Sequence, residues 1–404
     1  MSRTIWSYPW KYPESFVIAL GILLTGMIME MFLPSAGAFI PSWPGNLYLL
    51  IFIIGVAGLL IILRNNSEFL KWLGSGYAAI GLSSAFTLLV IIMGLIPQQP
   101  AMGFHHRLGL TNINASWPFY LTGLMMIFSL CLITAQRLKK WSYRNFIFIL
   151  NHLGLIIILL AGGLGKSDFE ELIMTLNMDK PVWYAKNAKG AKQDLDFALE
   201  MKDFDIQYHL PVFQIYEDGE IVKSIEVDTA EKKQTVNYKK MEIIVVKVMP
   251  EAVKMNGQYK EAQHPSAVTA IKLTVDEPNK KDKTSWVSSG SRMMAPQKIK
   301  TDEFSIGLRR PSPKIYETTA QLYSKQGRNE EVNIKVNHPI KVNDWKIYQS
   351  SYDQSMGRYS KISILTLVKD PWLWVVYTGI FMLIAGALGL FLYGKSYKIK
   401  PKQE

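Results

Sequence analysis

The sequence predicts a polytopic α-helical membrane protein of about six spans, with a large all-β extracytoplasmic domain between the fifth and sixth spans. Two observations support this prediction: apolar residues gather in six runs, and polar residues gather in one stretch, residues 166–370. Of the 404 residues 49% are apolar, and the formal net charge is +12. The mean hydropathy of +0.09 is expected for a chain that joins membrane-type and soluble-type sequence.

Each apolar run is long enough to cross a membrane. The runs contain few or no charges, and a span needs about 20 apolar residues. Glu30, close to the end of the first run, is the one acid inside a run. The predicted spans are residues 16–33, 47–63, 77–96, 117–135, 145–165 and 372–393. We therefore expect a membrane domain with five spans (1–165), an extracytoplasmic β-rich domain (166–370), and a final span with a basic cytoplasmic tail (371–404).

The distribution of basic residues predicts the orientation. Thirteen Lys and Arg lie outside residues 166–370. If the chain crosses six times, twelve of them fall on one side of the membrane and only Arg107 falls on the other. The positive-inside rule then puts both termini in the cytoplasm and residues 166–370 outside. The basic excess is thus explained by topology, and no basic patch indicates a nucleic-acid partner.

Residues 166–370 have the pattern of β-structure throughout. Leu195, Phe197 and Leu199 alternate with polar residues, as in a half-buried strand. The dipeptide Asp218-Gly219 lies between two strand-like runs and predicts a hairpin. We expect a sandwich or an open barrel, between which the pattern does not choose.

The inventory of reactive side chains excludes several kinds of chemistry. Cys131, in the fourth predicted span, is the single cysteine, so the chain has no internal disulfide and no C-x-x-C motif. No arrangement of residues indicates a catalytic site, and we assign no catalytic residue. His209, His264 and His338 are expected to be turn or surface residues, because they lack the spacing of metal ligands.

The fifth predicted span contains Asn151 and His152 within an otherwise apolar run. A polar residue at this depth needs a partner. Eight residues at 1.5 Å each place His152 about 12 Å inside the cytoplasmic edge at Arg144, in the inner half of the membrane. Neutral imidazole can ligate iron, and it can also form a structural hydrogen bond to a neighbouring helix, here with Asn151 as a possible participant. An apolar slot beside the imidazole would be lined by Phe148, Ile149, Leu155, Ile156 and Leu159.

Two more histidines, His105 and His106, lie in the predicted outer loop between the third and fourth spans. They are either interfacial polar residues of a short loop or a second contact, besides His152, for a metal or a metal-bearing cofactor. Adjacent side chains point in different directions on most backbones, so at most one of them is expected to ligate a given iron.

Three segments resemble the ResB (CcsB) family of the System II cytochrome c biogenesis machinery. The first begins at Asn151-His152-Leu153-Gly154-Leu155, and the second is LDFALEMKDFDIQYH, residues 195–209. The third is NHPIKVNDWKIYQSSYD, residues 337–353, followed by residues 357–391. Apart from the resemblance, Trp345, Ile347 and Tyr348 are expected to pack into the β-core. Small residues spaced by four, Ala161 with Gly165 and Ala385 with Gly389, are expected to let the fifth and sixth spans approach closely.

The resemblance implies a haem-handling, non-catalytic subunit of a cytochrome c synthase in the bacterial cytoplasmic membrane. Such a subunit carries non-covalently bound haem b across the membrane for attachment to apocytochrome c, together with a ResC (CcsA)-type membrane protein. The resemblance also implies that His152 is an axial ligand to the haem iron. Two features depart from the family pattern: four spans precede the histidine-bearing one, and no tryptophan-rich outer segment is present. The second axial ligand is expected from the partner, since no other histidine of this chain lies within a predicted span.

Two other classes of function compete with this one. A polytopic scaffold or receptor could present the outer β-domain for protein binding without haem, but it has no need of a histidine at that depth. An intramembrane enzyme such as a protease would need an acid pair, a Ser/His pair or a His-Glu metal motif, and the predicted spans contain none.

The predicted orientation can be tested with alkaline phosphatase, which is active only outside the cytoplasm. Fusion at Gly257 should give an active enzyme, and fusion at Glu404 an inactive one, because the positive charges hold the second site inside. The reverse pattern would contradict the orientation.

Overall fold

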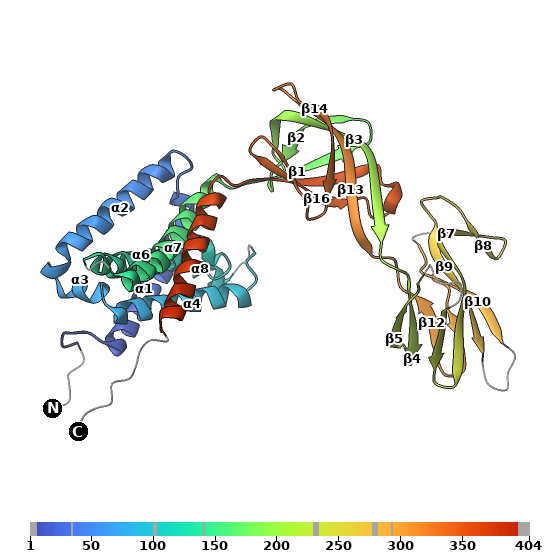
Figure 1. Cartoon of the computed structure of the whole chain (residues 1–404), viewed down its shortest axis with the longest axis horizontal. Coiled ribbons are helices and arrows are strands. Elements are labelled where there is room, and N and C mark those ends of the chain that lie inside the picture. Colours follow the sequence, from blue (N-terminus) through green and yellow to red (C-terminus); the bar gives the residue numbers. More distant parts are fainter. Residues whose placement is uncertain are drawn as a thin grey trace. The chain divides into compact units, whose positions relative to one another are not determined.

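The computed structural model describes residues 6–33, 35–99, 103–139, 142–228, 234–276, 282–291 and 294–394. The predicted basic tail after residue 394 lies outside the described residues. The chain divides into two compact units (Figure 1). The helical unit comprises Met1–Phe169 and Asp370–Glu404, and the β unit comprises Glu170–Lys369.

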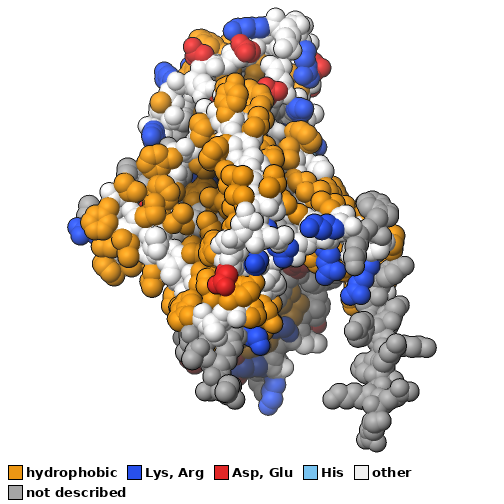
Figure 2. All heavy atoms as spheres, turned by 90° about the vertical axis from the view of Figure 1, so that its left-hand side faces the viewer, with side chains coloured by type: hydrophobic (Ala, Val, Ile, Leu, Met, Phe, Trp, Pro, Cys, Tyr) orange, Lys and Arg blue, Asp and Glu red, His pale blue; other side chains and the backbone are white. Residues whose placement is uncertain are grey.

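Within the described residues, six helices of the helical unit are long and apolar enough to cross a membrane. They are α1 (Tyr12–Phe32), α2 (Gly45–Leu63), α4 (Gly76–Leu95), α6 (Trp117–Leu138), α7 (Tyr143–Gly165) and α8 (Leu373–Gly394). The short helices α3 (Glu68–Leu73) and α5 (Phe104–Arg107) lie in connections between them. Hydrophobic side chains cover much of the face shown in Figure 2. The prediction of six apolar helices and a large β-rich domain is confirmed.

Polar residues mark the starts of several helices. The Ser75 hydroxyl accepts a hydrogen bond from the backbone N–H of Ala78 at the start of α4. The Ser142 hydroxyl does the same for Asn145 at the start of α7. At the start of α1, the Glu14 carboxylate accepts from the backbone N–H of Lys11. Each contact satisfies an N–H group that has no partner within its own helix.

Helices α7 and α8 pack with their backbones in direct contact. A Cβ atom added at Gly154 would lie 2.5 Å from the Leu383 nitrogen, and one at Gly379 would lie 2.9 Å from the Gly154 carbonyl oxygen. An added Cβ at Gly386 would collide with the backbone of Asn151. Small residues therefore set the distance between these helices, as expected. Gly154, Gly379 and Gly386 lie at this contact in addition to Gly389, which the sequence spacing identified.

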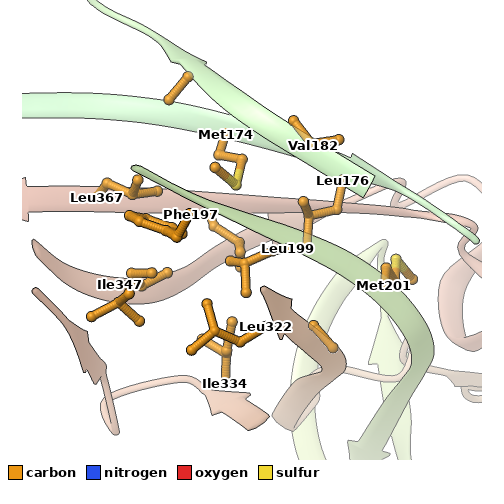
Figure 3. Packing of buried hydrophobic residues seen from close by; sticks show 14 of the residues in the cluster. Met174, Leu176, Val182, Phe197, Leu199, Met201, Leu322, Ile334, Ile347 and Leu367 are labelled. Carbon is orange, nitrogen blue, oxygen red and sulfur yellow. The ribbon is translucent and has the colours of Figure 1, made fainter. Parts of the chain in front are cut away.

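The β unit is built on an eight-stranded antiparallel sheet. Its order is β14-β13-β3-β2-β1-β17-β16-β15, and the edge strand β14 contacts β15 and β16, so the sheet curls into an open barrel. All eight strands contribute to one hydrophobic core, part of which is shown in Figure 3. The strands are β1 (Glu170–Asn177), β2 (Pro181–Lys186), β3 (Lys192–Tyr208), β13 (Pro313–Ser324), β14 (Asn329–Lys335), β15 (Ile340–Val342), β16 (Trp345–Tyr352) and β17 (Ile362–Lys369).

A second lobe is inserted between β3 and β13. Its two sheets have the orders β10-β9-β7-β6, with β8 paired to β7, and β11-β12-β4-β5, and they share one core. The strands are β4 (Val212–Glu217), β5 (Glu220–Glu226), β6 (Gln234–Tyr238), β7 (Met241–Met255), β8 (Gln258–Glu261), β9 (Val268–Asp276), β10 (Lys283–Ser288), β11 (Ile299–Lys300) and β12 (Ser305–Leu308). The predicted Asp218-Gly219 hairpin joins β4 to β5, and both residues have positive φ, as this turn requires. The β unit thus combines an open barrel with a sandwich.

Strand β16 differs from expectation at one position. Trp345 and Ile347 are buried, as predicted, but Tyr348 lies on the opposite face and is only partly buried. Gln349 takes the inward position and joins a buried network with Thr318 and Ser363. The period of two in a strand gives the reason, because consecutive residues cannot both face one core.

The contact between α7 and α8 predicts that Gly154→Ala destabilises the helical unit. The added Cβ would meet the backbone of α8, which has no side-chain freedom with which to yield, so we expect a loss of roughly 1–3 kcal/mol. Gly162→Ala is the matched control on the same helix, because its added Cβ meets nothing within 4 Å. Thermal unfolding of the purified protein in detergent measures both. Equal effects of the two substitutions would contradict the close packing.

Candidate functional site

His152 lies in α7, half-buried, with its ring fixed by a hydrogen bond within its own helix. Nδ1 is 2.9 Å from the carbonyl oxygen of Phe148, one turn earlier. A carbonyl oxygen only accepts hydrogen bonds, so Nδ1 carries the proton. In the neutral ring, the lone pair available to a metal is then on Nε2. Metal-bound histidines commonly show this arrangement, with the second ring nitrogen donating to a backbone carbonyl.

The same two residues stack on each other. The ring centroids of Phe148 and His152 are 3.8 Å apart, with an interplanar angle of 21°. The stacking and the hydrogen bond together fix the imidazole orientation. Nε2 forms no hydrogen bond with any described residue. The imidazole therefore presents an oriented lone pair that the described part of the chain leaves free.

Asn151 has a separate role. Its side-chain amide nitrogen donates to the carbonyl oxygen of Leu383 in α8, at 3.0 Å. Asn151 thus belongs to the helix contact described above, and no hydrogen bond joins it to His152. The alternative of a structural histidine bonded to a neighbouring helix, considered from the sequence, has no counterpart among the described hydrogen bonds.

The residues predicted to line a slot beside His152 divide into three groups. Phe148 contacts the imidazole directly. Ile156 is buried in the core of the helical unit, and Leu155 and Leu159 pack against that core. Those three side chains hold α7 against its neighbours. Ile149 is half-buried and outside that core cluster.

His105 and His106 lie in α5 and are exposed. Nδ1 of His106 is 2.9 Å from the hydroxyl of Thr111. His106 also lines a cavity of about 460 Å³ with Arg107 and Glu30. The Glu30 carboxylate accepts a hydrogen bond from the backbone N–H of Trp117 at the start of α6, which explains an acid at the end of an apolar run.

The structure does not bring these two histidines together with His152. His106 shares a cavity with Glu30, which bonds to Trp117 in the first turn of α6. His152 stacks on Phe148, which contacts Arg137 in the last turn of α6. The 22 residues of α6 separate the two places by about 30 Å. One haem iron cannot be shared between them.

Asp168 forms a polar cluster that the sequence did not reveal. Its carboxylate accepts hydrogen bonds from the backbone N–H of Trp43 at 2.7 Å, the side chain of Asn46 at 2.6 Å and the indole of Trp372 at 2.7 Å. Trp372 also packs closely on Gly165. The cluster ties the ends of α2, α7 and α8 together. The one signal in the sequence is a polar residue, Asn46, directly before an apolar run.

The β unit has its own cavity, of about 730 Å³, beside the connection from β3 to β4. His209 and His264 line it, together with Arg309, Arg310 and Tyr208. Burial raises the pKa of the Tyr208 hydroxyl, which therefore stays protonated. Among the described residues, no group of three or more His, Cys, Asp or Glu side chains could hold a metal ion.

The six apolar helices and the β unit define a membrane protein with a large β-rich domain. The ResB-like family model matches residues 138–361, more than half of the chain. The chain belongs to the ResB-like family. The matched range includes α7 with His152 and most of the β unit, and membership supports involvement in cytochrome c biogenesis, as the resemblance implied.

Other comparisons add little. No curated protein matches the sequence. Among solved structures, "Cytochrome c Heme Lyase CcmF" is similar over 95% of this chain and 46% of that one, with 8% identity and a TM-score of 0.26. The chain therefore spans about half the length of that protein, and a likeness at this level supports no statement about function.

Proposed function

We propose that the chain is the ResB-type subunit of a cytochrome c biogenesis complex. It carries haem b, bound non-covalently, across the bacterial cytoplasmic membrane for covalent attachment to apocytochrome c. It acts with a ResC/CcsA-type membrane protein, which supplies the second axial ligand. Membership of the ResB-like family supports this proposal.

The proposed orientation places both termini in the cytoplasm and the β unit outside. It rests on the basic residues in the connections at one end of the helices, among them Arg64, Lys71, Arg137 and Arg144. In this orientation the first half of α7, with His152, lies toward the cytoplasm. A haem bound there would be at the start of its path outward.

The observation that carries the proposal is the hydrogen bond from Nδ1 of His152 to the Phe148 carbonyl. It selects the tautomer in which Nε2 can ligate iron, and it holds the ring against rotation. Neutral imidazole is a common axial ligand of haem. Haem is the cargo here, and what the chain itself contributes is a fixed ligand in an apolar helical unit.

The chain is proposed to handle haem without catalysing its attachment. Cys131, its only cysteine, lies within α6 and is partly buried, so it cannot supply thiols at the outer surface. The thiols that form the covalent bonds belong to apocytochrome c. Joining them to haem is assigned to the complex with the partner.

Replacing His152 by Ala should remove most of the haem that copurifies with the protein and most of the cytochrome c yield. The reason is loss of the iron ligand, and the protein should still accumulate because the imidazole makes no hydrogen bond to another helix among the described residues. The Soret absorbance per protein is the measurement, and added imidazole should partly restore it. The double variant His105→Ala/His106→Ala is the matched control and should keep both haem and yield. A wild-type Soret band in the His152 variant would overturn the proposed role.

The proposed partnership predicts that the chain alone attaches no haem. Cells that express it without a ResC/CcsA-type protein should make no covalent c-type haem, detectable by haem staining after denaturing electrophoresis. Coexpression of the partner should restore the stain. Covalent haem formed by the lone chain would refute the division of labour.

A further inference from the structure

Arg137 lies in the last turn of α6 and is exposed. Its guanidinium carbon is 5.0 Å from the centroid of the Phe148 ring, in a cation–π contact. No described carboxylate forms an ion pair with it. The contact holds the charged group beside α7, which follows α6 after a short connection and packs against it (Figure 1).

Phe148 therefore has the guanidinium on one side and the His152 imidazole on the other. The imidazole covers one face of the phenyl ring at stacking distance, which leaves the opposite face for Arg137. The guanidinium carbon can be no farther from the imidazole centroid than these two distances combined. A positive charge is thus held at a limited and defined distance from the proposed iron ligand.

The direction from the His152 imidazole to the Arg137 guanidinium matters as much as the distance between them. An axial imidazole stands perpendicular to the porphyrin plane, so the normal of the imidazole ring runs parallel to that plane. Phe148 is stacked on the imidazole along this normal, and the Arg137 guanidinium lies over the phenyl ring. In a porphyrin bound through His152, the guanidinium would therefore be offset from the iron axis toward the porphyrin edge. The carboxylates of haem lie at one edge, and rotation about the iron–histidine bond can bring that edge to Arg137.

We propose that Arg137 binds a propionate carboxylate of the porphyrin whose iron His152 ligates, with Phe148 as the spacer between them. This inference rests on the proposed function. Guanidinium groups match the planar geometry of carboxylates and form two parallel hydrogen bonds with them. The pair fixes the rotation of the porphyrin about the axis of the iron–histidine bond, which a single axial ligand leaves free.

The competing explanation for Arg137 is a purely topogenic charge at the cytoplasmic side. Arg144, close by in the first turn of α7, provides the comparison. It is also exposed, but no described aromatic ring holds it in place. A topogenic role predicts that losing either charge has the same effect on porphyrin binding. The proposed carboxylate site predicts an effect on porphyrin binding only when Arg137 is replaced.

The test compares two probes, iron mesoporphyrin and its dimethyl ester, in which methylation removes the charge of the two carboxyl groups. Both are titrated into the purified full-length protein in detergent, and the dissociation constants are read from the Soret band. The wild type should bind the free acid at least about tenfold more tightly than the ester, because a charge-assisted pair is lost in the ester. The preference should fall as the salt concentration rises.

Four variants separate the possible outcomes. Arg137→Gln should lose the preference while still binding the ester as well as the wild type does, and Arg137→Lys should keep part of the preference. Arg144→Gln should behave as the wild type. His152→Ala should lose binding of both probes. If Arg137→Gln retains the full preference while His152→Ala loses binding, the carboxylate site is wrong and the iron ligand stands. If His152→Ala binds both probes normally, the proposed function fails, and this inference fails with it.

Discussion

The direct backbone contact between α7 and α8 is the constraint on which the remaining arrangement depends. Gly154, Gly379 and Gly386 remove the side chains that would separate the two helices, and the Asn151 amide adds a hydrogen bond across the contact. The chain leaves α7 for β1 and returns from β17 to α8, and these two strands pair along their whole length. The chain segments before and after the two connections thus lie side by side in each unit, as α7 and α8 in the helical unit and as β1 and β17 in the β unit. The Asp168 cluster fixes their ends within the helical unit.

Two neighbouring residues of α7 have different roles. Asn151 faces α8 and serves packing, whereas His152 bonds to its own helix and stacks on Phe148. Nε2 of His152 is therefore left without a hydrogen-bond partner among the described residues. His152 is also the one histidine within the six long helices. Burying such a group costs free energy unless a ligand completes it. In the proposed function the haem iron would complete this nitrogen, and Arg137 would pair with a carboxylate of the porphyrin.

Much of the architecture could be predicted from sequence patterns that extend over many residues. Apolar runs predicted all six long helices, because their length is set by the membrane. The Asp218-Gly219 turn was predictable because few residues adopt positive φ at low cost. The position of the second lobe between β3 and β13 was not, since pairing of distant strands leaves no local signal. Aromatic character alone predicts the wrong position for Tyr348, because the alternation along β16 buries Gln349 instead.

The candidate site was predictable in part. His152 stands out by polarity alone, but its hydrogen bond and its stacking on Phe148 depend on side-chain rotamers that no sequence pattern specifies. Arg137 was counted as one charge among twelve, because a topogenic residue and a ligand-binding one are identical in sequence. Which glycines lie at the contact between α7 and α8 depends on how the two helices cross. The spacing of small residues in the sequence therefore identified only some of them.

The iron–histidine stretching band in the resonance Raman spectrum of the reduced, haem-loaded protein tests the central claim most directly. The wild type grown with ¹⁵N-labelled histidine should show an isotope shift of this band. His152→Gly reconstituted with unlabelled imidazole should show the band without the shift, because the ligand then comes from solution. An unchanged isotope shift in that variant would mean that another histidine ligates the iron, and it would contradict the account.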